Sequence, residues 1–242
     1  MKKVMSFMLI LSMLVVGSSL SFARAQNDSI LSDESNQSFL DSILGGNLMY
    51  TLRSELPSNF VYSGTDKTFY TKNISDYGES GGQLYESAER VIGNNMYLKT
   101  GATGLNNENE SWIYIGNEFI FSGASSYATV YVTGNYNAYL GVTATGSATA
   151  QYNLVAEVYD MENGSRVGSR TIDSCSIAGM ADIEIRSGSI NKGIPVNFIS
   201  GHAYKVILKA EAVAKADMLA RASIDIYESP YKITLSSIKV GF

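Results

Sequence analysis

Apolar and polar residues alternate strictly along residues 128–158, and this alternation is the strongest structural signal in the chain. Every even position there is apolar, glycine or tyrosine, whereas the odd positions are mostly polar. Successive side chains of a β-strand point to opposite faces of the sheet, so the pattern predicts strands with one buried face. A second alternating run covers residues 204–226, and its apolar face is rich in alanine.

A single strand over residues 128–158 would span about 100 Å, so we expect the chain to turn inside this run. Two-residue hairpin loops reverse the alternation, whereas three-residue loops preserve it and favour a glycine. The sequence therefore predicts glycine-containing turns at residues 133–135 and 145–147, and a three-stranded meander across residues 127–159.

Further turn signals extend the β prediction to the end of the chain. Asn163-Gly164 is typical of a two-residue hairpin turn. We also expect a turn at residues 215–217, which would pair Ala214 with Met218, and a closing strand over residues 231–242. No helical pattern separates these segments, so we expect an antiparallel all-β domain over residues 111–242.

Small residues on the inward face favour two sheets packed face to face, which predicts a jelly-roll-like β-sandwich. An outer-membrane β-barrel is the alternative, because the alternating residues Ile238, Val240 and Phe242 resemble the closing strand of such barrels. A stripe of alanines, however, is a poor lipid-facing surface.

The N-terminal part differs in composition from the rest of the chain. Residues 1–25 have a basic start, an apolar stretch and an Ala-Arg-Ala end, which is the layout of a secretory signal peptide. Residues 26–110 form a polar region in which residues 29–44 and 83–92 show partial helical spacing, so we expect one or two short helices there.

Composition excludes several classes of function. The formal net charge of −5 argues against a basic nucleic-acid-binding surface. Cys175 and His202 are the single cysteine and the single histidine, which excludes disulfide frameworks and sites that need several such ligands. We expect Cys175 to point into the core and His202 to lie in an exposed turn, and we predict no catalytic site, metal site or cofactor.

Aromatic side chains on the outward parity are the candidate binding residues. Trp112, Tyr114, Tyr131 and Tyr139 are expected to form platforms for a glycan, with Tyr131 and Tyr139 close together on neighbouring strands of the meander. Two carboxylate pairs, Asp160 with Glu162 and Asp182 with Glu184, allow the alternative of a secreted hydrolase.

These observations favour an exported, non-enzymatic protein that acts outside the cell or at its surface. Adhesion, glycan binding and surface assembly are the expected roles, and long edge strands offer a route to self-assembly. We expect no nucleic-acid partner and no transmembrane helix.

Overall fold

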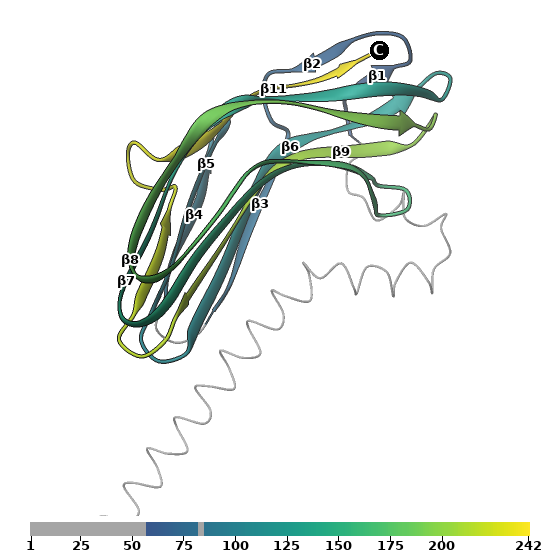
Figure 1. Cartoon of the computed structure of the whole chain (residues 1–242). Coiled ribbons are helices and arrows are strands. Elements are labelled where there is room, and N and C mark those ends of the chain that lie inside the picture. The colour runs from purple at the N-terminus through teal and green to yellow at the C-terminus, as the bar shows by residue number, and fades with distance from the viewer. Residues whose placement is uncertain (1–56, 82–84) are drawn as a thin grey trace, which may run out of the picture. The chain divides into compact units, whose positions relative to one another are not determined.

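Figure 1 shows the computed structural model of the chain, which describes residues 57–81 and 85–242. The described residues form eleven β-strands and no helix. In chain order these are β1 (Phe60–Tyr62), β2 (Lys67–Phe69), β3 (Ile74–Gly81), β4 (Tyr85–Ile92), β5 (Asn95–Thr103), β6 (Asn107–Ser122), β7 (Ser126–Asp160), β8 (Ser165–Phe198), β9 (Ala203–Ala216), β10 (Arg221–Asp225) and β11 (Lys232–Gly241).

The strands form one continuous sheet that folds into two packed layers. The first layer contains β4, β5, β10, β11 and β2 beside residues 126–143 of β7. The second layer contains β3, β1, β6 and β9 beside residues 148–160 of β7. Across the core, β5 faces β6 and β9, and β4 faces β6. This arrangement confirms the predicted all-β sandwich, in which all strand pairs are antiparallel except the parallel pair of β1 and β6.

The predicted three-stranded meander is wrong, because residues 126–160 form the single strand β7. The strand exchanges partners along its length: residues 129–137 pair with β11, residues 139–143 with β10 and residues 148–160 with β9. β8 follows β7 through the bend (Figure 1), and their pairing register shifts between Thr143 and Ala148. The chain thus bends from layer to layer and needs no turn.

Close packing explains the two glycines that had suggested turns. A Cβ atom on Gly134 would lie 2.1 Å from the carbonyl oxygen of Thr234 in β11, and a Cβ atom on Gly146 would lie 2.7 Å from that of Asp217. Glycine inside a strand often marks such a close backbone approach. Both glycines therefore lie within a continuous strand, where the missing side chain allows the backbone of another segment to come close.

We expect Gly134→Ala to destabilise the fold by about 1–3 kcal/mol, because the added methyl group must displace the β11 backbone. Gly101→Ala is the matched control, because the nearest atom to its Cβ would be the carbonyl oxygen of Ala222 at 3.5 Å. Urea unfolding of both variants measures the difference, and equal midpoints would contradict this explanation of Gly134.

The predicted buried faces are confirmed over most of both alternating runs. The even-numbered residues that are at most 7% exposed include Ala128, Val130, Val132, Ala138, Leu140, Val142, Ala148, Ala150, Tyr152, Leu154, Ala156 and Val158 of β7, and Tyr204, Val206, Leu208, Ala210, Ala212, Ala214 and Ala216 of β9. The core therefore lies between the layers.

The second alternating run turns later than predicted. β9 continues to Ala216, residues 217–220 connect it to β10 in the first layer, and Met218 is exposed. Ala214 pairs with Asn109 and Ala150, so its predicted pairing with Met218 is wrong. The reason is that this connection changes layers instead of closing a hairpin. At Asn163-Gly164 a hairpin turn does join β7 to β8, but four residues lie between the paired ends Asp160 and Ser165.

Residues 85–92 form strand β4, so the predicted helix over residues 83–92 is wrong. Pairing with β5 along its whole length outweighs the weak helical spacing. β1 to β5 lie at or before residue 103 and belong to the same sheet, so β structure begins well before residue 111. The predicted signal peptide and the predicted helix over residues 29–44 lie outside the described residues.

Candidate functional site

The outer face of the second layer carries an aromatic and polar surface built from residues in lateral register. Trp112 of β6 pairs with Gly78 of β3 on one side and with Glu211 of β9 on the other. Glu211 pairs with Asn153 of β7, which pairs with Ser174 of β8. Adjacent strands lie about 4.8 Å apart, so these side chains form a row that crosses the layer.

Two stacked rings form one end of this surface. The ring centroids of Trp112 and Tyr114 are 6.0 Å apart and the ring planes differ by 10°. Their chain neighbour Ile113 is fully buried, which places both rings on the outer face. The Trp112 indole leans over Gly78, where a Cβ atom would lie 2.7 Å from Cζ2. The absence of a side chain at Gly78 therefore makes room for the indole.

Beside the rings lies an open hollow of about 350 Å³. Its lining includes the carboxylates of Glu110 and Glu211, the amides of Gln151 and Asn153, and the hydroxyls of Ser174 and Ser176. Polar groups of this kind can fix the orientation of a ligand that contacts the neighbouring aromatic surface. We refer to this hollow and the Trp112–Tyr114 stack together as the β6–β9 face.

The groups around Glu211 lower the pKa of its carboxyl group. Partial burial acts to raise its pKa, but the ammonium group of Lys209 and the amide of Asn153 outweigh burial, so the pKa of Glu211 lies below its usual value. Lys209 Nζ lies 2.6 Å from Glu211 Oε1, and Asn153 Nδ2 donates to Oε2 at 3.3 Å. The hollow therefore contains an oriented carboxylate and an oriented amide.

The structure separates the predicted candidates into two faces. Tyr131 and Tyr139 lie in the half of β7 that belongs to the first layer, on the outer face opposite to that of Trp112 and Tyr114. They are eight residues apart on one strand, so the prediction that a turn brings them together is wrong. Tyr139 packs against Tyr231 with ring centroids 5.9 Å apart.

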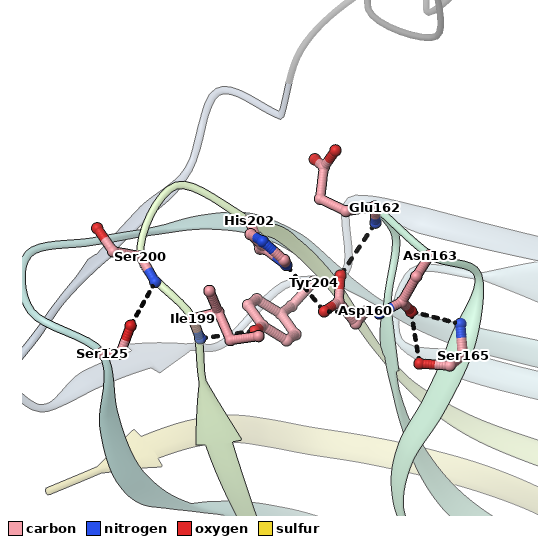
Figure 2. Close-up of polar contacts among 9 residues, drawn as sticks. All are labelled: Ser125, Asp160, Glu162, Asn163, Ser165, Ile199, Ser200, His202 and Tyr204. Atoms are coloured by element: carbon pink, nitrogen blue, oxygen red, sulfur yellow. Dashed lines mark hydrogen bonds and ion pairs between the residues drawn. The ribbon is translucent and has the colours of Figure 1, made fainter. Parts of the chain in front are cut away.

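Figure 2 shows a second polar cluster, at the end of the sandwich where the β7–β8 and β8–β9 connections meet. The nearly buried carboxylate of Asp160 lies 2.9 Å from Nδ1 of His202. It also accepts hydrogen bonds from the backbone N–H of Glu162 and from Nδ2 of Asn163. His202 does lie in a turn as predicted, but its side chain is partly covered and bonded.

A third cluster lies where the two halves of β8 face each other. The guanidinium of Arg186 binds the carboxylate of Asp173 through Nε and Nη2, and the carboxylate of Glu184 lies 3.4 Å from Nη1. Hydrogen bonding to Asp173 raises the pKa of Arg186. Cys175 packs against the core as predicted, and burial raises the pKa of its thiol. These polar groups tie the layers together at their shared edge.

Within residues 57–81 and 85–242, no three His, Cys, Asp or Glu side chains are grouped closely enough to hold a metal ion. The same residues include no helix with the length and apolar character needed to cross a bilayer.

Sequence reasoning identified Trp112 and Tyr114 but missed the polar residues beside them. Gln151, Asn153 and Glu211 are polar residues on the outward parity of alternating runs, which was visible in the sequence. What the sequence did not supply was the strand register that brings them beside Trp112.

No family model matches the chain, and no curated protein matches it. Solved structures similar to it include TmCBM61 in complex with beta-1,4-galactotriose, with 11% identity, a TM-score of 0.25, and 69% of this chain and 88% of that chain covered. Another is a family 11 carbohydrate-binding module from Clostridium thermocellum in complex with a beta-1,3-1,4-mixed-linked tetrasaccharide, with 11% identity, a TM-score of 0.24, and coverages of 72% and 94%.

A third similar structure is the enzymatically active domain of tailspike protein 4 from bacteriophage CBA120, with 8% identity and a TM-score of 0.22 over 67% of this chain and 19% of that chain. Binding modules and an enzyme thus occur among the similar structures. At these TM-scores the similarity assigns no function, which has to be argued from the β6–β9 face.

Proposed function

We propose that the protein binds glycans through the β6–β9 face. The observation that carries this proposal is the stacked pair Trp112 and Tyr114 beside a hollow lined by carboxylate, amide and hydroxyl side chains. A sugar ring has an apolar face of C–H groups and an edge of hydroxyl groups. Stacking on the aromatic rings suits the first, and hydrogen bonds to Glu211 and Asn153 suit the second.

The direction of the row suggests how a glycan lies on this face. Trp112, Glu211, Asn153 and Ser174 succeed one another across four strands. One sugar unit stacked on Trp112 leaves the next units above the polar hollow. We therefore propose that a glycan chain crosses the strands, and that its hydroxyl groups meet several hydrogen-bonding side chains in turn.

Retention on immobilised polysaccharides tests this proposal. The panel consists of cellulose, xylan, β-1,4-galactan, mixed-linkage β-1,3-1,4-glucan, starch and chitin, loaded with the chain beginning at residue 26. We expect retention on at least one polysaccharide and a lower retention of Trp112→Ala on the same one. No retention on any of them, or equal retention of both proteins, would count against the proposal.

Gly78→Ala tests whether glycan binding depends on the position of the Trp112 indole over Gly78. The added Cβ would lie 2.7 Å from Cζ2 of the indole, so the ring must tilt away from β3. We expect glycan affinity to fall several-fold while urea unfolding changes little, because Gly78 lies in the edge strand β3. Gly101→Ala on the first layer is the control, and its affinity should not change. An unchanged affinity of Gly78→Ala would show that the position of the indole over Gly78 is unimportant for glycan binding.

We further propose that the protein is exported and acts without catalysis at the cell surface or outside the cell. The signal-like residues 1–25 support export. The carboxylate pair at Asp160 and Glu162 favours a structural role over hydrolysis, because Asp160 is buried and is bonded to the backbone of Glu162 and to His202.

Self-assembly through the edge of β8 is less favoured than glycan binding. β8 pairs only with β7 among the described residues, so its other side is an edge. That edge carries register shifts and the charged residues Asp173 and Arg186 on its inward face. Irregular pairing and inward-pointing charges are features that oppose pairing between sheets.

A further inference from the structure

We propose that the opposite outer face carries a second glycan site centred on Tyr131, so that one molecule cross-links two polysaccharide chains. This inference rests on the proposed function of the β6–β9 face and extends it. Tyr131 lies between the fully buried residues Val130 and Val132 of β7, so it points away from the core on the first layer. The two aromatic surfaces therefore face in opposite directions.

Glycines on both neighbouring strands make room for the Tyr131 ring. A Cβ atom on Gly193 of β8 would lie 3.3 Å from Cε1, and a Cβ atom on Gly241 of β11 would lie 3.3 Å from Cε2. The ring thus occupies space that side chains of two flanking strands would otherwise fill. The residue is nevertheless 41% exposed, so part of the ring remains accessible to a ligand.

Tyr127 extends this aromatic surface along the strand. It has the same parity as Tyr131, lies four residues or about 13 Å before it, and is 79% exposed. Two exposed rings on one strand suit successive contacts with an extended glycan. Tyr139, by contrast, is half-buried against Tyr231 and is not part of the proposed site.

The groups around Tyr131 indicate a neutral polysaccharide. Its partner in β11 is Lys239, whose ammonium group lies 2.6 Å from the carboxylate of Asp66, so this positive charge is compensated. The next pair on this face is Thr133 with Ser237, whose hydroxyl groups lie 2.8 Å apart. Isolated tyrosines among hydroxyl groups and one compensated ion pair suit a neutral, hydroxyl-rich ligand better than an apolar protein surface.

Two readouts on the same samples test the proposal. The probes are the soluble polysaccharides of the panel, namely xylan, β-1,4-galactan and mixed-linkage β-1,3-1,4-glucan. Retardation in native gels containing each polysaccharide measures binding, and light scattering of the mixture measures cross-linking. The proteins are the wild type, Trp112→Ala, Tyr131→Ala, the double variant, and Tyr139→Ala as the control.

We expect the wild type and Tyr139→Ala to be retarded and to raise the scattering at intermediate protein-to-polysaccharide ratios. Each of Trp112→Ala and Tyr131→Ala should keep part of the retardation and lose the scattering increase, whereas the double variant should lose both. A bivalent binder behaves in this way because cross-linking requires both sites.

Other outcomes identify which proposal fails. Wild-type scattering by Tyr131→Ala, or complete loss of retardation in Trp112→Ala, would overturn the second site and leave the first intact. Scattering by the wild type without any polysaccharide would indicate pairing between copies and would also overturn the second site. Absence of wild-type retardation in every gel would overturn both sites.

Discussion

Replacing Trp112 with alanine is expected to weaken glycan binding at the β6–β9 face by at least about 30-fold, or about 2 kcal/mol, the range typical of a dominant aromatic contact. The indole is the larger ring of the Trp112–Tyr114 stack and lies against Tyr114 and over Gly78. Its removal leaves the hydrogen-bonding groups of the hollow in place but removes the stacking surface.

Isothermal titration with an oligosaccharide of the retained polysaccharide measures this loss. Both proteins in the comparison carry Tyr131→Ala, so that the β6–β9 face is measured alone. Trp112→Phe keeps an aromatic ring and should lose less affinity than Trp112→Ala. Equal losses for phenylalanine and alanine would contradict a stacking role for the side chain.

Replacing Asp160 with alanine is expected to destabilise the fold by about 3 kcal/mol, because it removes one partner from a buried hydrogen-bonded cluster. The Asp160 carboxylate accepts hydrogen bonds from the backbone of Glu162 and from Asn163, and it contacts Nδ1 of His202 (Figure 2). These groups join the β7–β8 turn to the start of β9. In Asp160→Ala all of them lose the carboxylate that they share.

Glu162→Ala is the matched control for Asp160→Ala. Its side chain points away from the cluster in Figure 2, so we expect its unfolding free energy to change by no more than about 0.5 kcal/mol. Urea unfolding followed by circular dichroism gives both values. A stable Asp160→Ala protein with wild-type glycan retention would mean that the cluster does not hold this end of the sandwich.

Alternation of side chains was enough to predict the buried face but not the path of the chain. Val130, Val132, Leu140 and Leu154 are buried because parity fixes which side of a strand each residue occupies, whatever the strand pairs with. The unbroken parity was itself the signature of one long strand. We predicted turns instead, because a single straight strand would be too long for the domain. The sequence did not reveal the bend between layers, since this bend depends on contacts with β9, β10 and β11.

Glycine at positions 134 and 146 illustrates why local sequence was ambiguous. A glycine can serve a turn or a close approach of another backbone, and only the partner strand distinguishes the two. Thr234 and Asp217, which approach these glycines, lie far along the chain. The weak helical spacing at residues 85–92 was likewise outweighed by pairing with β5.

Only part of the candidate site was predictable for the same reason. Trp112 and Tyr114 are two residues apart on one strand, so their shared face follows from local geometry. The neighbours Glu211 and Asn153 depend on the register of β6, β9 and β7. The pairing of Asp160 with His202 depends on two connections that meet at one end, which no local pattern encodes.

The chain's single tryptophan makes the proposed binding face directly observable. Trp112 fluorescence is followed while an oligosaccharide of the retained polysaccharide is added, with acrylamide quenching measured before and after saturation. We predict a saturable change in emission and protection from acrylamide at the concentrations that produce binding. Glycan binding with unchanged emission and unchanged quenching would contradict the assignment of the β6–β9 face.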